Sequence, residues 1–142
     1  MKMSQEAYNA VKELLKADPA DRGFIVFSGK HEMEYVQFMI EENGLLMNWP
    51  ILKKVPKRSV KVAELACREL IRKDYNRRNV SEIDRTAVLA LKEKEFMLDS
   101  EDLYANPGKE AEEIVALAAH LFINVFDYQK LDKIEIELVL EQ

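Results

Sequence analysis

The chain has 142 residues, of which 48% are hydrophobic and 33% are charged, and its formal net charge is −5. This balance provides enough apolar surface for a folded core, and it excludes a disordered acidic tail, a collagen-like fibre and a membrane-spanning protein. The single cysteine, Cys67, excludes an internal disulfide and a thiolate zinc site. We expect one folded domain over residues 1–142, in the reducing cytoplasm and without membrane association.

The first predicted element is a helix over residues 5–17. Its apolar side chains recur at helical spacing, and Ser4 is a favourable N-cap residue directly before it. The helix should end at Asp18, because the residue before Pro19 avoids the helical region of backbone space.

Three strands are predicted next, at residues 23–28, 33–41 and 45–49. The second strand has no cleanly polar face, which favours a central place in a sheet. Glu42-Asn43-Gly44 is typical of a hairpin turn, since asparagine and glycine tolerate positive φ. We therefore expect an antiparallel meander that ends at Pro50.

The second half of the chain combines helices with a final strand. We expect a loop over 50–58, helices over 60–74, 81–92 and 109–127, a short strand over 95–99, a solvated acidic loop at Asp99-Ser100-Glu101-Asp102, and a strand over 133–140. The segment Thr86–Leu91 is ambiguous and also fits a strand.

A run of strands flanked by helices predicts an α+β fold. The antiparallel sheet would consist of the N-terminal three-strand meander and the C-terminal strand, and the helices would pack against it. The final strand should expose one face to solvent, because Glu135 and Glu137 alternate with Ile136 and Leu138.

Basic side chains concentrate in residues 53–78, which hold ten cations and three anions, so this segment carries +7 and the rest −12. The candidate basic patch consists of Lys53, Lys54, Lys57, Arg58, Lys61, Arg72, Arg77 and Arg78. Clustered cations bind phosphates, but the acidic balance of the whole chain and a single aromatic residue there, Tyr75, argue against nucleic acid. The segment would also attract an acidic protein surface, including that of a second copy.

The sequence contains no recognisable catalytic or metal-binding motif. His31 lies in a turn, and His120 lies in the most apolar helix, where we expect a hydrogen-bonded packing residue. A calcium loop beginning at Asp99 fails, because Leu103 and Tyr104 stand where an oxygen ligand and a glycine are needed. We predict a protein that is not an enzyme and holds no cofactor or metal.

Apolar and sulfur-containing side chains gather on the central strands. Leu45, Met47 and Trp49 share one face of their strand, and we expect Met33, Tyr35 and Met39 beside them on the neighbouring strand. Burial in the core is the simpler interpretation. The functional interpretation is a peptide-binding sheet face, because thioether side chains adapt to varied partners.

Three segments carry a family resemblance. Tyr35-Val36-Gln37-Phe38 followed by Gly44-Leu45-Leu46, the segment from Ser81-Glu82-Ile83-Asp84 to Leu91, and Glu110 to Phe126 resemble YbjN-like and TY-chaperone-like domains. These domains are related in fold to type III secretion chaperones. The resemblance implies a helix packed on a strongly bent antiparallel sheet and a non-catalytic role in binding an extended peptide or a partner protein, often as a dimer.

We therefore expect a protein- or peptide-binding module, chaperone-like or regulatory, with a homodimer as one possible state. The first alternative is an enzyme or small-ligand protein with a pocket between sheet and helices, built on His31, His120, Tyr35 and Asp99. Nucleic-acid binding through residues 53–78 ranks last.

Overall fold

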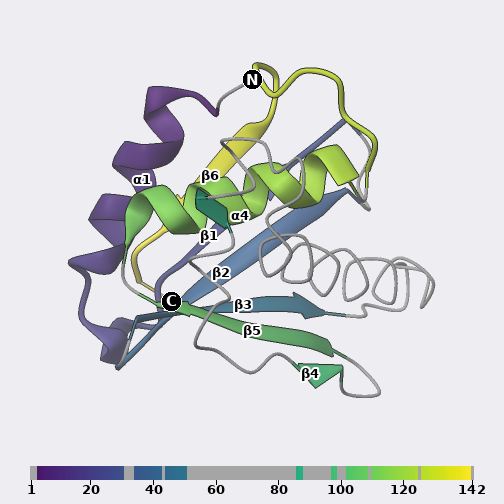
Figure 1. The fold of residues 1–142 in the computed structure, drawn as a ribbon. Coiled ribbons are helices and arrows are strands. Elements are labelled where there is room, and N and C mark those ends of the chain that lie inside the picture. The colour runs from purple at the N-terminus through teal and green to yellow at the C-terminus, as the bar shows by residue number, and fades with distance from the viewer. Residues whose placement is uncertain are drawn as a thin grey trace.

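The structure, a computed structural model, describes residues 3–30, 34–42, 44–50, 86–87, 97–98, 102–108, 110–124 and 126–141. In chain order, its elements are α1 (Gln5–Leu15), the 3₁₀ helix η1 (Pro19–Asp21), β1 (Phe24–Ser28), β2 (Tyr35–Glu41), β3 (Gly44–Pro50), β4 (Met97–Leu98), β5 (Asp102–Gly108), α4 (Ala111–Asn124) and β6 (Glu135–Val139) (Figure 1). The predicted helix over 60–74 and the basic segment 53–78 lie outside the described residues. Thr86 and Ala87 are helical, in agreement with the helix predicted there rather than the strand.

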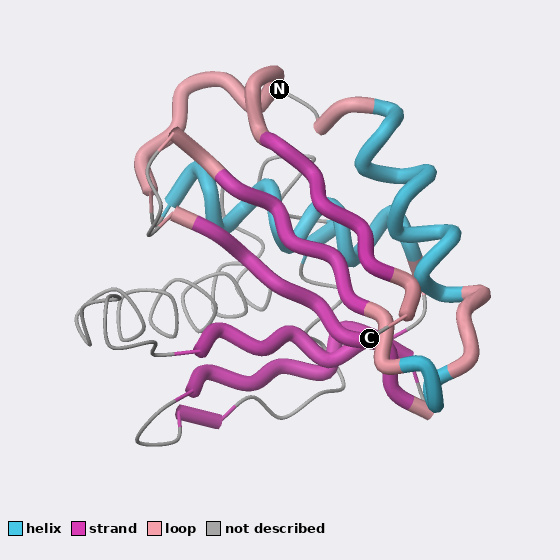
Figure 2. The backbone as a smooth tube through the Cα atoms, turned by 180° about the vertical axis from the view of Figure 1, so that it is seen from behind, coloured by secondary structure: helices cyan, strands magenta, loops and turns pink. Residues whose placement is uncertain are grey.

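The sheet has the strand order β4-β5-β3-β2-β1-β6, and each neighbouring pair is antiparallel. The predicted meander β1–β2–β3, the central position of β2 and the pairing of the C-terminal strand into the same sheet are confirmed. Helix α4 crosses in front of the sheet in Figure 1 and behind it in Figure 2, and α1 packs beside α4 and against β6 and β1. The α+β class is therefore confirmed.

Helix α1 begins directly after Ser4, as predicted, but it ends at Leu15, two residues before the predicted end of the helix. The Ser4 hydroxyl accepts a hydrogen bond from the Ala7 N–H at 3.4 Å, which satisfies one of the free amides of the first turn. Ala7, Val11 and Leu14 form the buried stripe of the helix. After the helix, the Asp18 carboxylate accepts a hydrogen bond from the Ala20 N–H at 2.9 Å and caps η1.

The core lies between α4 and one face of the sheet. Strand register places Ile25 opposite Phe38 and Phe27 opposite Val36, and all four side chains are fully buried. The rings of Phe27 and Phe38 meet edge-on at 6.1 Å. On the other side of this core, α4 is buried without interruption from Ile114 to Phe122.

One predicted loop is a strand. Residues 102–108 form β5 and pair with β3, whereas the acidic run Asp99-Ser100-Glu101-Asp102 and the Pro107-Gly108 pair indicated a loop. The register shifts between Leu45, which pairs with Gly108, and Met47, which pairs with Ala105. Pro107 therefore falls at a β-bulge, where its missing N–H costs no regular ladder hydrogen bond.

Within the described residues, no helix is both long and apolar enough to cross a lipid bilayer.

Candidate functional site

The predicted apolar face does not form as one surface. Strand pairing places Leu45 opposite Ile40, whereas Met39 lies opposite Leu46. Directly paired residues share a face and successive residues alternate, so Tyr35 and Met39 lie on the opposite face from Leu45. The expectation that Tyr35 and Met39 lie beside Leu45 on one face is wrong, and the side chains of Met47 and Trp49 lie outside the described part of the structure. Leu45 is fully buried, which matches the simpler interpretation for that residue, and Met33 lies outside the described residues.

The predicted packing role of His120 is confirmed. Its side chain is 4% exposed, and the Asn124 amide nitrogen lies 3.0 Å from its Nδ1 atom. The same amide donates to the His120 carbonyl oxygen at 2.9 Å. His31 and Asp99, the other histidine and the acid of the alternative enzyme site, lie outside the described residues. Among the residues that are described, no group of three His, Cys, Asp or Glu side chains is placed to hold a metal ion.

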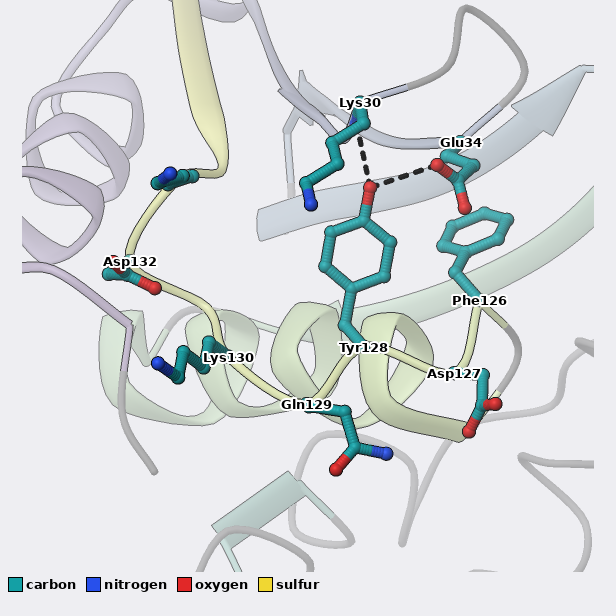
Figure 3. Close-up of a pocket in the computed structure, with 9 residues that line it drawn as sticks. Lys30, Glu34, Phe126, Asp127, Tyr128, Gln129, Lys130 and Asp132 are labelled. Carbon is teal, nitrogen blue, oxygen red and sulfur yellow. Dashed lines mark hydrogen bonds between the residues drawn. The ribbon is translucent and has the colours of Figure 1, made fainter.

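A cleft of about 520 Å³ opens at one end of the sheet, between the β1–β2 connection and the segment that links α4 to β6 (Figure 3). It is lined by Lys30, Glu34, Phe126, Asp127, Tyr128, Gln129, Lys130, Asp132 and Lys133. Its three lysines are balanced by three carboxylates. Neither Tyr35 nor His120, the two described residues of the predicted pocket, lines it.

Tyr128 joins the two walls of this cleft. Its hydroxyl accepts a hydrogen bond from the Lys30 N–H at 2.6 Å and donates one to the Glu34 carboxylate at 2.9 Å (Figure 3). Its ring packs edge-on against Phe122, with ring centres 5.3 Å apart. Because the hydroxyl both donates and accepts within the protein, Tyr128 acts as a clamp that fixes the segment between α4 and β6 to the β1–β2 turn.

The path of the chain after α4 brings Tyr128 into this position. Asp127 adopts a left-handed conformation with φ 59°, which turns the backbone away from the helix axis. The Tyr128 N–H then donates to the Phe122 carbonyl oxygen at 3.0 Å, a closing bond typical of a helix C-terminus. The Phe126 ring lies tilted against the Phe122 ring, with ring centres 5.2 Å apart. The segment leading to β6 is therefore held by the last buried turn of α4.

Burial raises the pKa of the Tyr128 phenol above its ordinary value. The hydrogen bond from the Lys30 backbone opposes this rise, while the hydrogen bond to Glu34 and the negative charge of that carboxylate add to it. The hydroxyl therefore keeps its proton at neutral pH and can donate to Glu34.

Strand β6 forms one edge of the sheet. Within the described part of the chain, β1 is its only partner. The Gly29 N–H donates to the Glu34 carbonyl oxygen at 2.7 Å and the Ile40 N–H to the Gly23 carbonyl oxygen at 3.0 Å, so the odd-numbered residues of β1 direct their backbone groups towards β2.

The even-numbered residues of β1 therefore face β6. Phe24, Val26 and Ser28 lie opposite Val139, Glu137 and Glu135, respectively. The direction of the backbone groups alternates along an antiparallel strand. The N–H and C=O groups of Ile136 and Leu138 therefore point away from β1, in the plane of the sheet, at its open edge. Two donors and two acceptors are thus arranged at strand spacing next to the cleft.

The edge strand β6 carries charged side chains on one face and apolar side chains on the other. Glu135 and Glu137 are exposed on the face away from the helices, while Ile136 and Leu138 are half-buried on the core face. The wet face predicted for this strand is confirmed. Its place at the sheet edge and its proximity to the cleft could not be predicted, because strand order depends on long-range pairing.

Comparison of the chain with protein-family models, curated proteins and solved structures gives no match.

Proposed function

We propose that this protein binds an extended segment of a partner protein, which adds to the sheet as a further strand along β6. One observation carries the proposal: the outward-facing backbone groups of Ile136 and Leu138 at an edge with no strand beside it in the described chain. Strand addition of this kind obtains affinity from main-chain hydrogen bonds and specificity from alternate side chains.

The cleft supports this proposal through its position. Lys133 lines the cleft, and β6 begins two residues later at Glu135. The Tyr128 clamp ties the segment before β6 to the β1–β2 turn, so the chain that leads into the edge strand is held before a partner arrives. A fixed edge avoids part of the ordering cost of association.

The proposal predicts that Leu138→Pro abolishes peptide binding. Proline removes the outward N–H of residue 138, and its ring occupies the place of an added strand. The bonds between β6 and β1 survive, since residue 138 does not donate to β1. We expect a dye-labelled peptide of alternating valine and threonine to bind the unmodified chain and to bind Leu138→Pro at least tenfold more weakly, as measured by fluorescence anisotropy.

Leu138→Ala is the matched control. It loses the same half-buried side chain but keeps the N–H, so it should bind within a few-fold of the unmodified chain. Circular dichroism and thermal unfolding establish that both variants are folded. Equal binding by the proline and alanine variants, or no peptide binding by the unmodified chain, would contradict strand addition at β6.

A further inference from the structure

We infer that the segment bound along β6 is one in which basic residues alternate with apolar ones. This inference rests on the proposed function and specifies the chemical class of the partner. It follows from the two faces of the edge strand: exposed Glu135 and Glu137 on one side, and half-buried Ile136 and Leu138 on the other.

The added strand must present its own side chains in the same alternation. Residues that pair directly across two strands lie on the same face, whether the strands run parallel or antiparallel. Two residues of the partner therefore lie beside Glu135 and Glu137, and the residues next to them lie beside Ile136 and Leu138. The four positions therefore alternate between apolar and basic residues in either orientation.

The outer face of β6 has a local excess of negative charge. Glu135 and Glu137 are two residues apart, about 7 Å along the strand. On β1 they face Ser28 and Val26, neither of which carries a charge. Lysine or arginine at the two opposing positions of an added strand would supply the missing cations, and cross-strand pairs of opposite charge stabilise a sheet.

The inner face of β6 provides the apolar half of the pattern. Ile136 lies opposite Phe27, and Leu138 lies opposite Ile25. Both residues of β1 are fully buried, whereas Ile136 and Leu138 remain half-buried because the sheet ends there. Apolar side chains on an added strand would remove the remaining surface from water and extend the core by one strand.

Charge also argues against a second copy of β6 as the partner. In antiparallel self-pairing centred on Ile136 or Glu137, glutamate lies opposite glutamate, and like charges placed directly opposite each other destabilise the pair. An acidic edge of this kind favours a chemically different, basic segment over a copy of itself.

Three peptides test the inference, each with a Val-x-Val-x core, Gly-Ser flanks and blocked ends, at concentrations where the peptide is monomeric. The variable position x is lysine, threonine or glutamate. We expect the lysine peptide to bind at least tenfold more tightly than the glutamate peptide, with threonine between them, by isothermal titration calorimetry. The advantage of lysine should shrink at high salt.

The double variant Glu135→Lys, Glu137→Lys should reverse this order and prefer the glutamate peptide. The matched control is Glu41→Lys, Glu42→Lys, which changes the net charge equally at exposed positions of the β2–β3 turn. The control should keep the preference for lysine, because its new charges lie away from β6.

The outcomes separate the two proposals. Equal binding of the three peptides, lost in Leu138→Pro, would overturn the basic specificity and leave strand addition intact. A preference for lysine that the two double variants weaken equally would show attraction to net charge alone and would also overturn it. If none of the three peptides binds, both the specificity and the proposed function fail.

Discussion

Replacing Phe122 with alanine is expected to lower the free energy of unfolding by about 3–5 kcal/mol, as large-to-small changes at buried aromatic sites do. Phe122 is fully buried near the end of α4. Its ring contacts those of Phe126 and Tyr128, which belong to the segment leading to β6. The change therefore leaves a cavity in the core and removes the packing surface of the Tyr128 clamp. Equilibrium unfolding in urea measures the loss.

Ile123→Ala serves as the control for this prediction. It shortens the neighbouring residue of the same helix, which is only half-buried and takes no part in the contacts between the aromatic rings. Ile123→Ala should lower the free energy of unfolding clearly less than Phe122→Ala does. A similar loss in both variants would show that α4 responds uniformly to truncation and that the aromatic cluster has no particular role.

Gly29→Ala is expected to destabilise the protein by about 2–3 kcal/mol, the cost of forcing atoms into a packed site. A Cβ atom at residue 29 would overlap the Tyr128 hydroxyl and lie 2.8 Å from the ring carbon that bears it. The ring cannot swing away freely, because it packs against Phe122 and its hydroxyl is bonded to Lys30 and Glu34. Either the clamp opens or the β1–β2 turn moves.

A double-mutant cycle with Tyr128→Phe isolates this contact. Phenylalanine lacks the hydroxyl that meets the new Cβ, so Gly29→Ala should cost at least 1 kcal/mol less in the Tyr128→Phe background than in the unmodified chain. Urea unfolding of the four proteins supplies the cycle. If Gly29→Ala costs the same in both backgrounds, the strain arises elsewhere in the turn and the clamp does not depend on this glycine.

Local sequence patterns predicted most of the elements correctly. The N-cap at Ser4, the hairpin at Gly44 and the apolar run from Ile114 to Phe122 each depend on neighbouring residues, and each is present in the structure. Glycine at position 44 is required in the hairpin turn, where it adopts a φ of 129°. Alternation of glutamate with Ile136 and Leu138 likewise identified β6 and its wet face.

Features that depend on register or on distant contacts could not be predicted in this way. The faces of β2 and β3 were matched incorrectly, because a shift of one residue in pairing exchanges every side chain between the two faces. Strand β5 was not predicted, because a proline within a segment argues against a strand. This proline falls at a bulge, and the bulge is defined only by the pairing with β3. The Tyr128 clamp joins residues 94 positions apart, and no short pattern marks both ends.

The open edge of β6 was missed for the same reason. The sequence predicted a C-terminal strand but not its neighbour, and an edge exists only once the strand order is known. The sequence assigned the candidate partner surface to the central strands, where Leu45 is part of the core. The structure instead favours the edge of the sheet. Backbone groups provide this surface, and every residue except proline carries the same donor and acceptor, so no side-chain pattern marks it.

Hydrogen exchange at the backbone amides of β6 tests strand addition most directly. In the free protein, we expect rapid exchange at Ile136 and Leu138 and slow exchange at Glu135 and Glu137, whose amides are directed towards β1. Saturation with the lysine–valine peptide should slow exchange at Ile136 and Leu138 at least tenfold and leave the two glutamates unchanged. Amides of Ile136 and Leu138 that are already protected in the free protein, or that stay unprotected when the peptide is bound, would contradict the account.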